Sequence, residues 1–344
     1  MPILLNVEIM SISTTSTRVL QAKNSAASTP SSIGPIGRIE TETQLTSQRR
    51  KGFITTVIAT EQDARDFVDN ILRKELKGIT DSGEISRLNL RVIANSELLN
   101  KGIFPKDLIE AVIKLNWPNT NDAYSIVYFG YNNAGRSIAK SERTSFETSI
   151  KTLMPSSRRE DVTTSEKLHT GITFKRATAE ELIQSQQVAV LNMLNEHFGY
   201  NTSEAESIIR DSRYILFVAI GEKGDVAGMS MGEEATIYTN TGNKLRMIEI
   251  TNGAVIPEYG GNGLYASISS ALISYLAKDL DIDLVYSESN LERPTLLKAI
   301  GQQGRRYAGI LPNNSVVDNG FRSMVVTYLT REDLNQITLS QMKR

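Results

Sequence analysis

The sequence contains no cysteine and only two histidines, His169 and His197. Without cysteine, the chain can form no disulfide, no thiolate zinc site and no acyl-cysteine intermediate. Two histidines are too few for a histidine-rich metal centre, so we expect no bound metal. The chemistry must therefore come from carboxylates, hydroxyls, amides or backbone groups.

Membrane and nucleic-acid features are also missing. No run of about eighteen apolar residues occurs, as a transmembrane helix would need. The first fifteen residues include Glu8 and lack a basic flank, so they do not read as a signal peptide. The formal net charge of -1 argues against a nucleic-acid binder. We expect a cytoplasmic protein that binds neither nucleic acid nor membranes.

The 344 residues are enough for about two domains. Ser, Thr, Gln and Gly dominate the start of the chain, and a polar, breaker-rich stretch follows Pro155. The expected division is a flexible arm at 1–50, a small α/β domain of unknown role at 51–153, a linker at 154–171, a second domain at 172–330 and a tail at 331–344.

Apolar periodicity and turn residues predict the elements of the first domain. Thr60 and Asp63 fit a capping box at the start of a helix. The expected elements are a strand at 53–59, a helix from Thr60 through Leu76, a strand at 88–92, a helix from Pro105 through Leu115, a hairpin of 124–129 with 136–140, and a helix at 141–153.

The second domain is predicted to be a mixed, largely antiparallel sheet flanked by helices. Ser203 and Glu206 suggest the start of one helix, and Pro312-Asn313-Asn314 suggests a turn. The expected strands are 172–176, 214–220, 226–234, 283–289, 307–311 and 321–330, and the expected helices are 179–198, one after Ser203, and 292–302.

The stretch from Lys244 to Leu280 organises the rest. It alternates as a strand, with Met247 and Glu249 on one face, and Pro257 ends that strand. Glycines then precede apolar residues at helical spacing. A helix N-terminus with exposed N–H groups favours anions, and glycine lets the backbone approach a phosphate closely.

Two ligands fit such a glycine loop. Residues 261–266 match the dinucleotide pattern G-x-G-x-x-G/A. However, Pro257 to Gly260 separate the strand from the match, and Asp281 and Asp283 precede the next strand instead of ending it. The other reading is a loop for the diphosphate of an acyl-coenzyme A.

With its order of elements, the region 172–330 resembles the GNAT superfamily of N-acetyltransferases. That family has a strand ending near Val-x-Pro, then Arg/Gln-x-x-Gly-x-Gly/Ala, then a helix. The first signature position falls on Glu258 or Gly260, a departure that removes one phosphate-facing side chain. The matching positions are Val255, Ile256, Pro257, Gly260, Gly261, Asn262, Gly263 and Leu264. The resemblance implies that Ala254 and all of these except Pro257 bind acetyl-CoA.

A narrower resemblance is to β-lysine N-acetyltransferases. It rests on residues 304–314, on Gly320 to Met324, and on the parallel between Ala254 to Leu264 and their glycine loop. We interpret this likeness as the sign of a related subfamily, and we do not infer a shared substrate from it.

The resemblance also implies residue roles. Glu249 is the candidate general base, and its alternative is a strand carboxylate that pairs with Arg246 or faces solvent. Backbone N–H groups near Ala254 and Val255 would receive the acetyl carbonyl, with a bulge at Gly253. The tyrosine that usually protonates the leaving thiolate falls on Ile300. The nearby replacements are Tyr307, which we select as the second catalytic candidate, Tyr286 and Ser289.

The predicted function is direct transfer of an acetyl group from acetyl-CoA to a primary amine in a ternary complex. The acceptor is a small molecule or a peptide, and a homodimer is one option for assembly. The alternative is a catalytically degenerate or regulatory acyl-CoA-binding module. Acidic residues could attract the amine or merely face solvent: Glu196, Glu204, Glu206 and Asp211. The first domain could also be a degenerate tandem copy, with the hairpins 124–140 and 214–230 as equivalents.

Overall fold

We describe the fold from a computed structural model. It describes residues 39–42, 49–82, 86–115, 123–132, 138–154, 170–238, 244–279, 281–317 and 320–342. Most of the predicted arm and linker, His169, and the 133–137 part of the predicted hairpin lie outside these ranges. No helix within them is long and apolar enough to cross a membrane.

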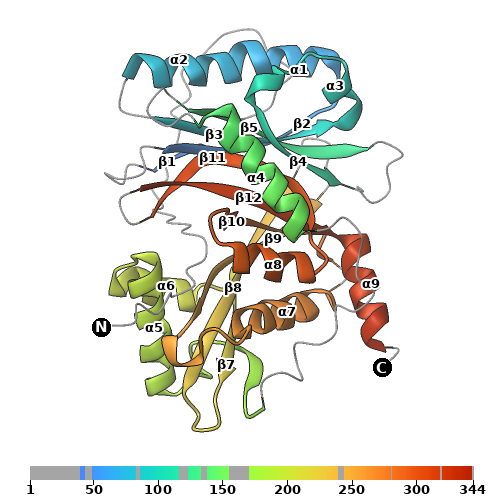
Figure 1. Ribbon diagram of the computed structural model, residues 1–344. Helices are drawn as coiled ribbons and strands as arrows, with labels where there is room; N and C mark the ends of the chain where they lie inside the picture. The colour runs from blue at the N-terminus through green and yellow to red at the C-terminus, as the bar shows by residue number, and fades with distance from the viewer. Residues whose placement is uncertain are drawn as a thin grey trace.

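All described strands belong to one sheet of twelve, in the order β1-β2-β3-β5-β4-β11-β12-β10-β9-β8-β7-β6 (Figure 1). Only two neighbouring pairs are parallel, β2 with β3 and β9 with β10. The predicted class, a mixed and largely antiparallel sheet flanked by helices, is confirmed. The strands are β1 Ile39–Glu42, β2 Arg49–Ile58, β3 Arg87–Asn95, β4 Ile109–Leu115, β5 Tyr124–Asn132, β6 Thr173–Ala177, β7 Tyr214–Ile220, β8 Val226–Tyr238, β9 Lys244–Val255, β10 Leu284–Asn290, β11 Arg306–Val317 and β12 Gly320–Thr330.

The helices lie between these strands, and most of those predicted are present. Thr60 and Asp63 form the predicted capping box of α1. The helical segments are α1 Glu61–Phe67, the π-helical η1 Val68–Leu72, α2 Arg73–Ser82, α3 Ser96–Asn100, η2 Lys106–Leu108, α4 Lys140–Leu153, α5 Gln184–Phe198, α6 Thr202–Arg210, η4 Pro257–Tyr259, α7 Leu264–Leu276, α8 Pro294–Gln302 and α9 Arg331–Met342.

Two predictions for the first domain are wrong. The helix from Pro105 is a single 3-10 turn, and Ile109–Leu115 is strand β4. Ile109, Val112 and Ile113 favour extended backbone, and β4 gains ladders on both sides, from β5 and β11. Of the predicted hairpin partner at 136–140, the structure describes residues 138–140, and none of these is in a strand, since Lys140 begins α4; β5 pairs with β3 and β4 instead.

Other boundaries in the second half need correction. Helix α5 begins at Gln184, because residues 178–183 form a turn in which Thr178 N–H donates to Glu181. Asn201, not Ser203, caps α6 and forms a capping box with Glu204. The predicted turn at Pro312-Asn313-Asn314 is an irregularity inside β11. Residues 39–42 of the predicted arm form β1, and the predicted tail carries α9.

The two halves of the chain repeat one topology. In the first, β2 and β3 are parallel across α1, η1 and α2, and β5 and β4 complete the order β2-β3-β5-β4. In the second, β9 and β10 are parallel across α7, and the order is β9-β10-β12-β11. The order reverses at the antiparallel β4–β11 junction, as a local two-fold axis would require. The repeat therefore matches β2–β5 to β9–β12, and not to the 214–230 hairpin.

The sheet curls so strongly that distant strands touch. Four strands separate β3 from β10, which in a flat sheet would place them about 24 Å apart. Yet Arg91 of β3 donates to the Tyr286 hydroxyl of β10 at 3.0 Å. One apolar cluster likewise joins Val57 and Ile93 to Ile237 and Leu245. The N-terminal half thus folds over one face of β9, β10 and β12.

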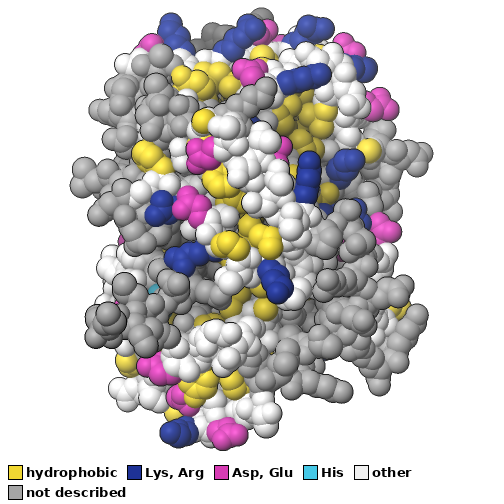
Figure 2. All heavy atoms as spheres, in the orientation of Figure 1, with side chains coloured by type: hydrophobic (Ala, Val, Ile, Leu, Met, Phe, Trp, Pro, Cys, Tyr) yellow, Lys and Arg dark blue, Asp and Glu magenta, His cyan; other side chains and the backbone are white. Residues whose placement is uncertain are grey.

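The helices cover the remaining faces. Helices α4, α7, α8 and α9 pack on the opposite face of the second half, and α5 and α6 cover β7 and β8 on the inner face. Helices α1 and α2 cover the first half at the top of Figure 1. Figure 2 shows Lys and Arg side chains along that top edge, so these helices bury one face and present charge on the other.

The β4–β11 junction depends on Gly309. A Cβ there would lie 2.2 Å from the Glu110 carbonyl oxygen and 2.5 Å from Ala111 Cα. We expect Gly309→Ala to lower the free energy of unfolding by about 1–3 kcal/mol, because backbone must shift to admit the methyl group. Urea denaturation measures this. Gly78→Ala, in α2 with open space around it, is the control, and an equal loss in both would contradict the role of the junction.

Candidate functional site

The site begins where β9 and β10 separate. The two strands pair in parallel only from Met247 with Leu284 to Glu249 with Tyr286. Both then continue without a shared ladder, β9 to Val255 and β10 to Asn290. Backbone groups facing this opening need other partners, because buried N–H and C=O groups are rarely left unpaired. The opening therefore leaves backbone groups that an extended ligand with its own amides could pair with.

A bulge in β9 shapes one wall of the slot. Thr251 pairs with Met231 and Ala254 with Met229, so β9 has one extra residue there. Asn252 takes a left-handed φ of 43°, and a Cβ on Gly253 would lie 2.4 Å from the Tyr265 ring. The predicted bulge at Gly253 is confirmed.

Beyond the bulge, one amide points into the slot. Ile256 N–H donates to the Ala227 carbonyl on the β8 side at 3.0 Å. Strand amides alternate in direction, so the N–H of Val255 points the other way, toward β10. There it faces the region where the β9–β10 ladder has ended.

The glycine loop leaves the start of α7 open. Gly263 is the N-cap, with φ 76° and no side-chain cap. Gly261 also has a left-handed φ of 81°, and a Cβ on either glycine would meet nothing within 4 Å. The first turn of α7 contains no acidic side chain. This helix start therefore suits an anion.

Two pockets flank the loop. One of about 680 Å³ includes Tyr259, Asn262 and Lys223 in its lining. The other, about 630 Å³, lies between α5 and the β7–β8 turn and includes Ile256, Pro257 and, again, Lys223. Lys223 thus supplies positive charge beside the loop.

Glu249 is buried, and its environment is specific. Its Oε2 accepts a 2.8 Å hydrogen bond from the Tyr286 hydroxyl, which in turn accepts from Arg91 at 3.0 Å. The alternative partner, Arg246, is committed to Glu234 and Asp279. Glu249 is therefore held by a series of hydrogen bonds that runs from β9 through Tyr286 to Arg91 in the N-terminal half.

The surroundings of Tyr286 and Arg91 fix the protonation states of these two side chains. Burial, then the facing Glu249 carboxylate, raise the pKa of Tyr286 well above its ordinary value, so its hydroxyl stays protonated. Burial opposes the charge of Arg91, but Tyr286, Tyr128 and Glu288 outweigh it and raise the pKa of Arg91. Tyr286 therefore remains a donor to Glu249.

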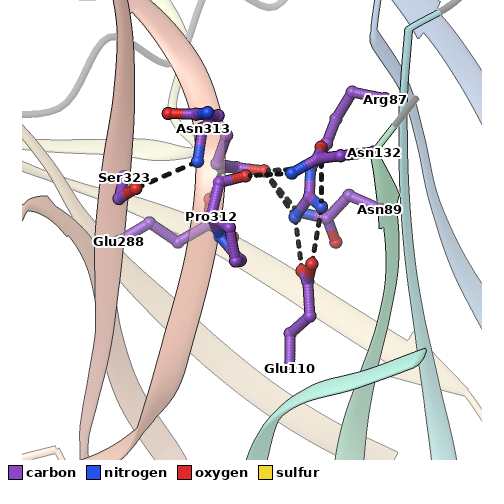
Figure 3. A network of polar contacts seen from close by, with 9 residues as sticks. Arg87, Asn89, Glu110, Asn132, Glu288, Pro312, Asn313 and Ser323 are labelled. Carbon is purple, nitrogen blue, oxygen red and sulfur yellow. Dashed lines mark hydrogen bonds and ion pairs between the residues drawn. The ribbon is translucent and has the colours of Figure 1, made fainter. Parts of the chain in front are cut away.

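A second buried network continues across the two halves (Figure 3). Arg87 of β3 forms a bidentate ion pair with Glu110 of β4 and donates to Asn314 of β11 at 3.3 Å. Asn314 also donates to Glu288 at 3.2 Å and accepts from Asn89. Asn314, which the sequence suggested as a turn residue, serves this network.

The other predicted residues lie elsewhere. Tyr307 is 41 % exposed, near Glu147 and Arg143 of α4, and shares its face with Ser287, opposite to Glu249. Burial raises the pKa of Tyr307 to about 12. This geometry gives no support to Tyr307 as general acid, and that role stays a prediction.

The predicted tyrosine position also lacks a polar group. Ile300 is fully buried in the core under the sheet. Of the acidic residues, Glu204 caps α6 and Asp211 pairs with Arg213, while Glu196 lines the pocket beside α5. His197 lines the same pocket.

Sequence reasoning missed the contribution of the first half. Arg87, Asn89 and Arg91 alternate with Leu88, Leu90 and Val92 in β3, which is the signal of a strand with one polar and one apolar face. The alternation shows that β3 has a polar face, but the contact between that face and Tyr286 follows only from the curl of the whole sheet.

Comparisons with known proteins found similar folds. No protein-family model and no curated sequence matches the chain. Among solved structures, Arabidopsis thaliana NAA60 with acetyl-CoA has a TM-score of 0.41 at 9 % identity, covering 47 % of this chain and 99 % of its own. Vibrio cholerae spermidine N-acetyltransferase with CoA and spermine has a TM-score of 0.39 at 15 % identity, and the match covers 48 % of this chain and 99 % of its own. The Escherichia coli ribosomal-protein-S18-alanine N-acetyltransferase has a TM-score of 0.38 at 17 % identity, and the match covers 46 % of this chain and 93 % of its own.

The Arg87–Glu110 pair should be important for stability. We expect Arg87→Met to cost about 3–5 kcal/mol of unfolding free energy, because it strands a buried carboxylate. The control is Arg73→Met, which breaks the exposed pair with Asp69 and should cost less than about 1 kcal/mol. Equal effects in urea denaturation would show that the buried network does not join the halves.

Proposed function

We propose that the protein is an acetyl-CoA-dependent N-acetyltransferase of the GNAT type. The observation that carries this is the continuity of three features: the β9–β10 opening, the bulge at Asn252–Gly253, and the uncapped, glycine-led start of α7. Together they offer an inward-facing amide for the thioester, a slot for the pantetheine arm and an anion site for the diphosphate.

The residues present fit coenzyme A. Amides of Gly260 to Leu264 would hold the diphosphate, since no side chain caps α7 and the left-handed glycines leave open space. Backbone of Ala254, Val255 and Ile256 would pair with the amides of the pantetheine arm. The Val255 N–H is the best-placed donor for the acetyl carbonyl as it gains negative charge.

Glu249 would act as general base. A lysine-type amine has a pKa of about 10.4, so only about one molecule in a few thousand is free base at pH 7. Glu249, directly or through a water, would take the proton from the attacking nitrogen. Tyr286 would orient the carboxylate, and Arg91 would orient Tyr286. A chain without cysteine has no acyl-cysteine relay, so transfer would be direct, in a ternary complex.

The acceptor would be a primary amine of a small molecule or peptide. Glu233 pairs with Glu249 across β8 and β9, so two carboxylates lie on the inner face of the sheet. Such a face favours a cationic substrate. The proposal also includes a cytoplasmic location, with a homodimer as one option for assembly.

A second candidate is an acyl-CoA-binding regulatory module without turnover. It is favoured by the absence of a tyrosine at Ile300 and of Arg or Gln in the loop. It would bind coenzyme A but release no thiol with any amine. A dinucleotide site is disfavoured for two reasons. Strand β10 ends at Asn290 and not at the acidic residue that would bind a ribose, and the only parallel pairs among the described strands are β2–β3 and β9–β10, whereas a dinucleotide fold has a series of parallel strands.

Binding of coenzyme A tests the glycine loop. We expect calorimetry to detect binding to the full chain and Gly263→Val to weaken it at least about tenfold, or about 1.4 kcal/mol. The β-branched side chain cannot easily adopt a φ of 76°, so the amides would turn away. Gly102→Val, with φ 71° and equally open space, is the matched control. Unchanged affinity in Gly263→Val would remove the loop from the site.

Turnover tests Glu249. Thiol release with a set of primary amines should fall about 10²–10⁴-fold in Glu249→Gln, because the amide cannot accept the proton. Coenzyme A affinity should stay within about twofold, because Gln keeps an oxygen for the Tyr286 hydroxyl. Glu97→Gln, exposed on α3 in the first half of the chain, is the control. A Glu249→Gln protein with normal turnover would exclude this residue as the base.

A further inference from the structure

Arg305 is a buried cation in the second half of the chain. It precedes β11, and its side chain bridges α7 and β10. One terminal nitrogen donates to Ser287 Oγ at 2.8 Å and the other to Ser269 Oγ at 3.0 Å. Its Nε has no hydrogen-bond partner. The guanidinium is thus enclosed by neutral hydroxyls.

No acid balances this charge within the described ranges. Arg87 has Glu110 and Arg91 has Glu288, whereas the ion pairs of the described residues include none for Arg305. Burial lowers the pKa of Arg305 to about 10, and only the nearby Tyr265 hydroxyl opposes this. An uncompensated buried charge is costly, so its retention points to an anion that the chain does not itself supply.

The guanidinium lies beneath the β9–β10 opening. Helix α7 packs on β8 and β9, and α8 packs on β10. Ser287 follows Tyr286, the last β10 residue that pairs with β9, and Ser269 lies in the second turn of α7. Arg305 therefore bridges β10 and α7 at the level where the strands part, on the face opposite to Glu249.

We propose that Arg305 is the counter-charge for the sulfur of coenzyme A when the thioester is cleaved. The inference rests on the proposed function and supplies the role that a tyrosine at Ile300 would have had. Arg305 approaches the slot from one face of the sheet while Glu249 approaches from the other.

The step balances without a general acid. The amine nitrogen forms a bond to the acetyl carbon and loses its proton to Glu249. The carbon–sulfur bond breaks, and its electron pair stays on sulfur as a thiolate beside Arg305. The products are the acetylated amine, the thiolate and one proton, which later leaves to solvent. A thiolate beside a buried cation is a better leaving group than one in an apolar site.

The test compares coenzyme A with desulfo-coenzyme A on the full chain by calorimetry, at about pH 7 and about pH 9. A free thiol has a pKa of about 8.5, and a neighbouring cation lowers it. We expect coenzyme A to bind more tightly than the desulfo compound, with a preference that rises with pH to about tenfold or more at pH 9.

Variants identify the cation. Arg305→Gln should lose the preference for the thiol while binding desulfo-coenzyme A as the wild type does, and Arg305→Lys should restore part of it. Arg176→Gln, which removes an arginine bonded to Tyr275 of α7, is the control and should keep the preference.

The outcomes separate the two proposals. If wild-type protein binds both compounds equally at both pH values, the Arg305 proposal is wrong and the acetyltransferase proposal stands. If neither compound binds, the acetyltransferase proposal itself fails. A full preference in Arg305→Gln would assign the effect to another group. Because the first comparison uses wild-type protein, it holds even if a variant misfolds.

Discussion

The structure depends on closing one sheet over its own inner face through a buried ionic junction. Gly309 lets β11 approach β4 at backbone contact, and Arg87, Glu110 and Asn314 tie β3, β4 and β11 together behind it. Buried ion pairs add little net stability compared with apolar packing, but they tolerate few alternative geometries. Here the buried pair lies at the junction where the two halves of the curled sheet meet. The curl then brings β3 over β10, so that a residue from the first half, Arg91, reaches the hydroxyl that bonds Glu249.

The same sheet must open where the ligand would enter. Antiparallel ladders hold β8 to β9 and β12 to β10 along most of their length, so these neighbours keep the two walls in place while the parallel β9–β10 ladder stops at Glu249 and Tyr286. The bulge at Asn252 and Gly253 turns β9 away without breaking its pairing to β8. Because β9 and β10 are each paired on the side away from the opening, the opening is pre-formed, and a pre-formed slot lowers the entropy cost of binding a flexible arm.

Much of this could be predicted from local sequence. The alternation around Glu249, the stop at Pro257, the glycine loop and the following helix depend on neighbouring residues, and all appear where the pattern placed them. The boundary errors at α5 and α6 have local causes, but the errors in the type of element arose where distant partners decide. Residues 109–115 have apolar spacing that fits a helix, but two ladders make them a strand, and Asn314 resembles a turn residue but fills a buried network. Arg91 and Arg305 carry no motif at all. Their roles depend on which strands the fold brings together.

The repeated topology explains why only one half would hold coenzyme A. Both halves run from a strand through a helical crossover to a parallel strand, so both have a helix start at the same place. In the first half, Thr60 and Asp63 occupy the first amides of α1, and Glu61 and Asp63 add negative charge there. In the second half, Gly263 leaves the amides of α7 without a side-chain cap and no acid follows. An anion is repelled at one start and favoured at the other. The first half, with its own helix start closed, contributes through the opposite side of its strands, where Arg91 completes the environment of Glu249.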